Sequence, residues 1–132
     1  MKPKTIDINC GDYSVKADVY DAGINGPVAL FLIGRTSSRS KPRYHQFLPR
    51  LAKELGISSV IFDYSGHGDS PLTIEERSSA QHLEEVLAVF DWAKIKYPKG
   101  KFFVFGSSYG GFLATHLSQQ RDFDILTLQA PA

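Results

Sequence analysis

The sequence predicts an α/β fold in which a mostly parallel sheet carries helices on both faces. Continuous apolar segments, such as residues 28–33, are typical of strands that are buried on both sides. Segments with apolar residues at helical spacing separate them, and this alternation favours right-handed crossovers and a parallel sheet. The 132 residues, of which 42% are apolar, suffice for a single domain with a core of its own.

The expected strands begin with a hairpin. Residues 5–9 and 14–20 alternate between apolar and polar side chains, and Gly11-Asp12 lies between them, which indicates an antiparallel pair. Apolar strands are then expected at residues 28–33, 58–64, 102–105 and 125–128.

Two crossover helices are expected from apolar residues spaced by three, four and seven. The face of the first consists of Tyr44, Phe47, Leu48, Leu51 and Leu55. The face of the second consists of Leu83, Val86, Leu87, Phe90 and Ala93. Gly56 ends the first helix and Pro98 stops the second, and residues 112–118 predict a third.

Residues 102–111 predict a serine nucleophile, because an apolar strand runs into a Gly-x-Ser-x-Gly turn centred on Ser108. A serine that projects above the end of a sheet needs a strained backbone with no bulk two positions before and after it. The following helix points its first N–H groups back toward the serine, so the Tyr109 N–H is an expected oxyanion donor. Such a pattern also marks ordinary turns, and the preceding strand and following helix distinguish this one. A turn of this kind is called a nucleophile elbow, and its glycines here are Gly106, Gly110 and Gly111. The strand that leads into it is the elbow strand.

The chain resembles the N-terminal half of an α/β-hydrolase in three segments, LFLIGRTSS, IFDYSGHGDS and VFGSSYGG. The match runs across nearly the whole chain and is similar to the smaller acyl hydrolases and the serine-aminopeptidase-like branch. The resemblance implies that Ser108 is the nucleophile. It also implies a second oxyanion N–H in the loop after the third strand, at Gly34 or Arg35. Most members have His-Gly where this chain has Ile33-Gly34.

The resemblance places the triad acid after the sixth or seventh strand and the triad histidine after the eighth. We therefore expect residues 1–132 to form one incomplete domain, a hydrolase core truncated after the sixth strand. An apolar final strand with an unpaired edge and no covering helix agrees with that expectation. A triad without its base loses several orders of magnitude in rate, so we expect this chain alone to be nearly inactive.

None of the four histidines is expected to act as the base. His116 lies eight residues after Ser108 on the same predicted helix, about 12 Å away at a rise of ~1.5 Å per residue. His82 is expected to face solvent on the preceding helix, and His45 opens the first crossover helix. His67 follows the fourth strand, where the resemblance implies a structural or substrate-side residue.

The acidic residues after the fourth strand are expected to serve the turn. The strand order of the family places one strand between Asp63 and the elbow strand, an offset of about 10 Å at ~4.8 Å per strand. We therefore expect Asp63 to cap the following turn, with Asp69 and Ser70 as turn and cap residues.

Four cations occupy the loop after residues 28–33, namely Arg35, Arg39, Lys41 and Arg43. Two interpretations remain open: a solvated loop, or a site that attracts a carboxylate or phosphate on the substrate.

Composition excludes several classes of protein. A net charge of +1 does not indicate the strongly basic surface that binds nucleic acid or an anionic membrane. The sequence has no apolar run of the ~18 residues that a membrane span requires and no signal-peptide pattern. Cys10 is the only cysteine, which rules out an internal disulfide and a thiolate zinc cluster. We expect a cytoplasmic protein with no metal or cofactor and a small-molecule acyl substrate.

The predicted function is hydrolysis of a small ester or thioester through an acyl-enzyme on Ser108. A serine peptidase that acts on short peptides is one alternative, because G-x-S-Y-G-G also resembles the elbow of such enzymes. A non-catalytic binding module of hydrolase shape is another. A dinucleotide-binding fold is disfavoured, because Pro71 replaces the third glycine of the fingerprint.

Overall fold

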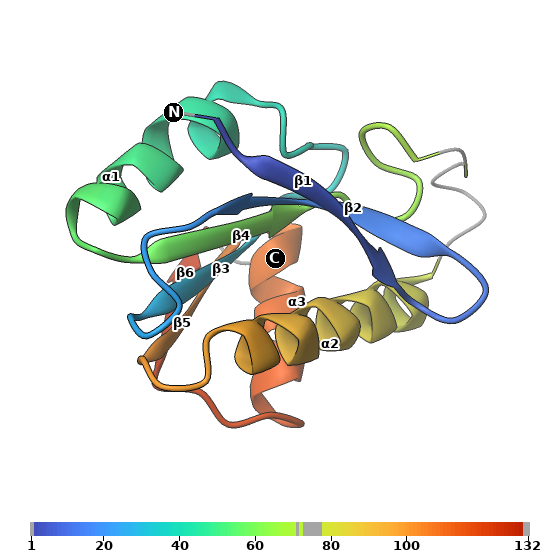
Figure 1. The fold of residues 1–132 in the computed structure, drawn as a ribbon. Coiled ribbons are helices and arrows are strands. Elements are labelled where there is room, and N and C mark those ends of the chain that lie inside the picture. Colours follow the sequence, from blue (N-terminus) through green and yellow to red (C-terminus); the bar gives the residue numbers. More distant parts are fainter. Residues whose placement is uncertain (1, 71, 73–77, 131–132) are drawn as a thin grey trace.

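A computed structural model describes residues 2–70, 72 and 78–130. They form a six-stranded sheet with helices on both faces, as the sequence predicts (Figure 1). The spatial order of the strands is β1-β2-β4-β3-β5-β6. Their bounds are β1 Lys4–Asn9, β2 Ser14–Tyr20, β3 Val28–Leu32, β4 Ser58–Phe62, β5 Phe102–Ser107 and β6 Ile125–Gln129.

The pairing of the strands is antiparallel at one edge and parallel in the rest of the sheet. β1 and β2 form the predicted hairpin, and β2 also pairs antiparallel with β4. β3 lies between β4 and β5 and is parallel to both, with Leu30 opposite Val60 on one side and Val104 on the other. The prediction that one strand separates Asp63 from the elbow strand is therefore confirmed.

The helices cover opposite faces of this sheet. α1 (Leu48–Glu54) lies on one face, and α2 (Ser79–Lys96) and α3 (Tyr109–Ser118) lie on the other (Figure 1). α2 begins with a capping box, in which the Ser78 hydroxyl accepts from the Gln81 N–H and the Gln81 side chain accepts from the Ser78 N–H. A helical segment thus lies at each of the three predicted places.

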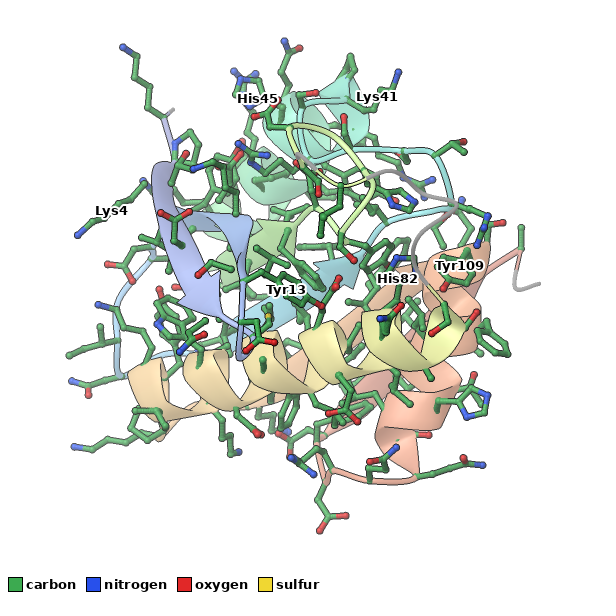
Figure 2. All side chains as sticks on the ribbon, turned by 90° about the vertical axis from the view of Figure 1, so that its right-hand side faces the viewer. Lys4, Tyr13, Lys41, His45, His82 and Tyr109 are labelled. Carbon is green, nitrogen blue, oxygen red and sulfur yellow. The ribbon has the colours of Figure 1, made fainter. Side chains whose placement is uncertain are left out.

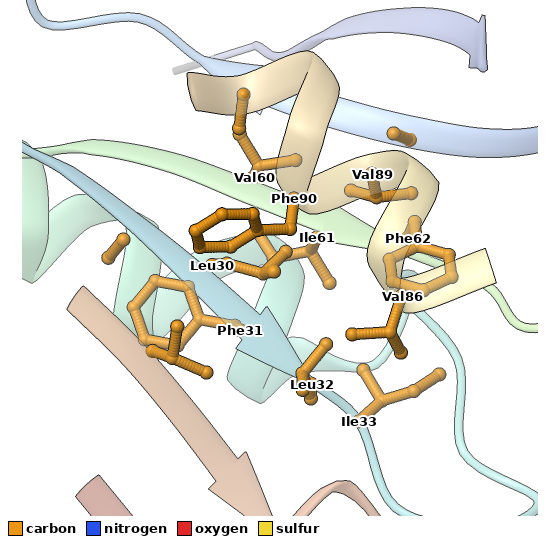
Figure 3. Close-up of a cluster of buried hydrophobic side chains, with 14 of the residues drawn as sticks. Leu30, Phe31, Leu32, Ile33, Val60, Ile61, Phe62, Val86, Val89 and Phe90 are labelled. Atoms are coloured by element: carbon orange, nitrogen blue, oxygen red, sulfur yellow. The ribbon is translucent and has the colours of Figure 1, made fainter. Parts of the chain in front are cut away.

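The core lies between the central strands and the helices. Leu30 and Val60 are fully buried in a cluster that also includes Phe90 of α2 (Figure 3). The ring of Phe90 packs on Phe102, with centroids 4.5 Å apart. Because the central strands are buried on both faces, they are apolar at almost every position, which is why the sequence identifies them.

The first crossover helix differs from its prediction. It opens with a π-helical turn, η1 (Arg43–Phe47), and α1 follows directly. Phe47, Leu51 and Leu55 are 68%, 49% and 69% exposed instead of buried. Tyr44 and Ala52 are buried. Leu51 and Leu55 border an apolar surface hollow together with Phe103 of β5, so this part of the predicted face lies beside the sheet but is uncovered.

β6 is the edge strand and pairs in parallel with β5, so that Ile125 lies opposite Phe103. All five of its residues are exposed. Within the described ranges, we find no helix with both the length and the hydropathy needed to cross a bilayer.

Candidate active site

Ser108 occupies the sharp turn between β5 and α3, as its sequence pattern predicts. Its backbone has φ of 54° and ψ of −115°, values close to the first central position of a type II′ turn, where glycine is preferred. A non-glycine residue in such a conformation stores roughly 1–3 kcal/mol of strain. The residue is exposed, so this turn holds the serine at the surface beyond the carboxyl end of β5.

Two glycines allow the chain to make this turn. A Cβ atom on Gly106 would lie 2.4 Å from the carbonyl oxygen of Gly110, and one on Gly110 would lie 2.1 Å from the carbonyl oxygen of Leu32. Both neighbours are backbone atoms, which cannot rotate away. The N-terminus of α3 therefore packs directly on β5 and β3, and the Gly111 N–H donates to the Ser108 carbonyl at 2.9 Å.

The predicted oxyanion residues lie beside Ser108. Tyr109 is the first residue of α3, so its N–H has no acceptor within the helix. A Cβ atom on Gly34 would lie 3.9 Å from the Ser108 Cβ, which places the loop after β3 against the serine. The Arg35 Cζ lies 5.4 Å from the centroid of the Tyr109 ring. The structure brings these residues together, and their role as an oxyanion hole stays a prediction.

The prediction that His82 faces solvent is wrong. Its side chain is fully buried in the first turns of α2, beside Tyr109 at the start of α3 (Figure 2). The Nε2 lies 2.9 Å from the Ser65 carbonyl oxygen, so Nε2–H is the donor. In the neutral ring, Nδ1 then accepts from the Tyr109 hydroxyl at 2.7 Å. His82 therefore holds the side chain that follows the nucleophile.

A buried carboxylate, that of Glu85, binds the same residue, Ser65, that His82 contacts. Glu85 is fully buried and accepts from the Ser65 N–H at 2.8 Å. The hydroxyls of Ser65 and Tyr13 also donate to it, each at 2.5 Å. A buried charge is tolerated when hydrogen bonds satisfy it, and three donors do so here. The network connects the hairpin, the turn after β4 and α2 to the start of α3.

His67 is buried in the turn after β4 and has a structural contact there. Its Nδ1 donates to the Ser65 carbonyl at 3.2 Å, and its buried Nε2 has no partner among the described residues. Burial lowers the pKa of His67, and nearby His82 and Arg35 lower it further, while the hydrogen bond to the Ser65 carbonyl partly opposes this shift. Ser70 holds the same turn as predicted, because its hydroxyl accepts from the Gly66 N–H at 3.0 Å.

The prediction that Asp63 caps this turn is wrong. Its carboxylate accepts from the Arg39 N–H at 2.8 Å and forms a close ion pair with the Arg39 guanidinium. The same guanidinium donates to Asp18 at 3.1 Å and to Asp69 at 3.3 Å. Arg39 is thus neutralised by three acids, and it braces the loop that carries Gly34 and Arg35.

Among the described contacts, no histidine is hydrogen-bonded to the Ser108 hydroxyl. All four histidines belong to the described residues, and none of their hydrogen bonds reaches the Ser108 hydroxyl. His116 packs its ring on Phe112, with centroids 4.6 Å apart, and His45 is exposed on η1. The described contacts therefore give no support to one of these histidines as the proton acceptor that a serine hydrolase requires.

The sequence reasoning missed Glu85, its donor Tyr13 and the ion pairs of Arg39. Tyr13 and Glu85 are 72 residues apart, so no local pattern connects them. One signal was present: His82 and Glu85 lie three residues apart on the helical stripe that the buried Val89 continues. Polar side chains on such a stripe indicate buried hydrogen bonds.

The sheet order and the serine turn define an α/β-hydrolase, and solved structures of that class superimpose on the chain. A putative hydrolase from Agrobacterium vitis S4 has 28% identity and a TM-score of 0.75 over 99% of this chain and 52% of its own. Esterase Pf2001 from Pyrococcus furiosus has 25% identity and a TM-score of 0.79 over 98% of this chain and 49% of its own.

Sequence comparison gives the family. Residues 30–132 match the family described as serine aminopeptidase, S33, and the chain belongs to this family. Lysophosphatidylserine lipase ABHD12 of Bos taurus is 32% identical over 110 residues, which make up 80% of this chain and 27% of that protein. The chain thus spans about a quarter of the length of this curated relative and about half of the two solved structures.

Replacing Gly110 by alanine is expected to lower the free energy of unfolding by about 2 kcal/mol or more, because the new Cβ meets the Leu32 carbonyl. Gly26→Ala is the matched control, since its Cβ would have no neighbour closer than 3.5 Å. Urea denaturation of both variants measures the difference. Equal stabilities would show that α3 does not approach β3 as closely as described.

Glu85→Gln is expected to lower the free energy of unfolding by about 1–3 kcal/mol, because an amide cannot accept from all three donors. The control Glu84→Gln changes the exposed neighbouring residue and should stay within about 0.5 kcal/mol of the parent. Both values come from chemical denaturation at neutral pH. If Glu84→Gln lowered the free energy of unfolding as much as Glu85→Gln does, the hydrogen-bond network of Glu85 would be contradicted.

Proposed function

We propose that Ser108 is the nucleophile of an acyl hydrolase that acts on a small ester or thioester. The observation that carries the proposal is the exposed serine in a strained backbone at the start of α3. Strain of this kind persists only where the surrounding structure imposes it, and it concentrates at functional sites. Membership of a hydrolase family supports the same role.

In the proposed reaction, the Ser108 Oγ attacks the carbonyl carbon while a general base takes its proton. The negative charge on the carbonyl oxygen is stabilised by the N–H groups of Tyr109 and of Arg35 or Gly34. The N-terminal end of α3 favours that charge as well. The alcohol or thiol leaves with a proton from the base, and water then releases the acid from the acyl-enzyme.

The general base and its acid partner are proposed to come from outside residues 1–132. The described hydrogen bonds and ring contacts of the four histidines involve residues other than Ser108, which supports this proposal. Without a base, the chain alone retains only the rate that binding and oxyanion stabilisation provide, several orders of magnitude below the full value.

The relatives favour an ester over a peptide bond. One is a lysophosphatidylserine lipase and another is an esterase. Hydrolysis of short peptides is the second candidate, because the matched family is described as serine aminopeptidase. The cytoplasmic location and the absence of nucleic-acid and membrane partners stay predictions from the sequence.

A fluorophosphonate probe tests the nucleophile. We expect the protein at its natural length to form a covalent adduct on Ser108, detected by mass spectrometry of peptides. Ser108→Ala should abolish labelling, while Ser118→Ala, which changes a serine at the far end of α3, should leave it intact. Residues 1–132 alone should react orders of magnitude more slowly. No adduct on the natural-length protein would refute the hydrolase and favour a binding module of the same shape.

A further inference from the structure

The structure separates the four cations after β3 into different roles. Arg39 is neutralised by carboxylates, as described above. Lys41 is exposed and extends outward from the molecule (Figure 2). Arg35 and Arg43 instead lie against the residues on either side of Ser108. Arg35 is exposed and Arg43 is half-buried, so both stay accessible to a ligand while each contacts an aromatic ring.

Arg43 contacts the residue that precedes the nucleophile. Its Nη1 donates to the Ser107 hydroxyl at 3.3 Å. Its Cζ lies 5.5 Å from the ring centroid of Phe105 and 5.8 Å from that of Tyr44. Aromatic contacts of this kind restrict a guanidinium while its remaining N–H groups stay available to an anion.

Arg35 contacts the residue that follows the nucleophile. Its Cζ lies above the Tyr109 ring, and its charge contributes to the lowered pKa of His67. Among the described residues, no carboxylate lies within ion-pair distance of Arg35 or Arg43. Two positive charges thus flank Ser108 without an acidic partner in the described parts of the chain.

Arg43 also reaches a space large enough for a ligand. It lines a surface hollow of about 930 Å³ over η1 and α1. Arg50 adds a second guanidinium to the lining, Glu54 adds one carboxylate, and Phe47 and Leu51 add apolar surface. An anionic ligand with an apolar part therefore finds complementary groups on the side of this hollow that Arg43 lines.

We propose that Arg35 and Arg43 form an anion subsite around Ser108, so that the substrate carries a carboxylate or phosphate near the bond that is cleaved. The proposal rests on the proposed role of Ser108 for its reference to a substrate. Arginine suits this task because its planar N–H groups bind both kinds of anion through paired hydrogen bonds.

The test measures binding of uncleavable ligands to the 132-residue chain with Ser108→Ala, so that it does not depend on catalysis. Decyl phosphate and decanoate are the anionic probes, and decyl glucoside is the neutral one. Dissociation constants at low salt come from calorimetry or NMR titration. Arg43→Gln and Arg35→Gln remove the proposed charges, and Lys41→Gln removes an exposed charge from the same loop.

We expect at least one anionic probe to bind about tenfold more tightly than decyl glucoside. Each arginine variant should bind that anionic probe about tenfold more weakly and bind decyl glucoside as its parent does. Lys41→Gln should stay within about twofold of its parent. A preference for phosphate or for carboxylate supports the subsite and identifies its anion. Arg43→Lys, which keeps the charge but not the paired hydrogen bonds, should lie between the parent and Arg43→Gln.

Three results would overturn the subsite. The first is equal affinity of the parent for anionic and neutral probes. The second is an equal loss of affinity for both kinds of probe in Arg43→Gln, as expected if Arg43 only positions Ser107. The third is a loss of affinity in Lys41→Gln as large as in the arginine variants, which would mean that the charge of the whole loop attracts the probe.

Circular dichroism of each variant checks the fold. If anion selectivity is present but the fluorophosphonate adduct is absent, the proposed hydrolysis fails while the anion site stands.

Discussion

The left-handed backbone of Ser108 is the constraint on which the candidate site depends. The chain leaves β5 and enters α3 within one residue, and hydrogen bonds hold that residue on both sides. Its N–H donates to the Gln129 carbonyl of β6 at 2.9 Å, and its carbonyl accepts from Gly111. Because both ends are fixed by packed elements, the serine keeps a conformation that it would not adopt alone.

Two buried charge networks hold the loops that approach this serine. Glu85 accepts a hydrogen bond from the Ser65 N–H in the turn after β4. The Ser65 carbonyl in turn binds His82, which restrains the Tyr109 side chain. Arg39 ties the loop after β3 to acids on β2 and after β4. Each network is satisfied by several hydrogen bonds, so it restricts a loop to one arrangement. The rigid sheet and these two networks together place Ser108, Tyr109 and Gly34 beside one another.

The sequence predicted the features that depend on local patterns. Apolar runs predicted the central strands. The glycine spacing predicted the turn at Ser108, because the backbone of α3 approaches β5 and β3 so closely there that a Cβ atom would not fit. The exposure of Leu51 and Leu55 was not predictable from spacing, since spacing does not show that the hollow they border on the sheet is uncovered. His82 was misplaced for a related reason, because its partners Ser65 and Tyr109 are 17 and 27 residues away.

The most direct test compares the free energies of unfolding of Ser108→Gly and Ser108→Ala in urea. Glycine relieves roughly 1–3 kcal/mol of backbone strain and loses roughly 0.5–1 kcal/mol to the entropy of the unfolded chain. If Ser108 is held with φ near 54°, the glycine variant should be more stable than the alanine variant by about 1 kcal/mol. An alanine variant that is as stable as the glycine variant, or more stable, would contradict the strained turn and the nucleophile inferred from it.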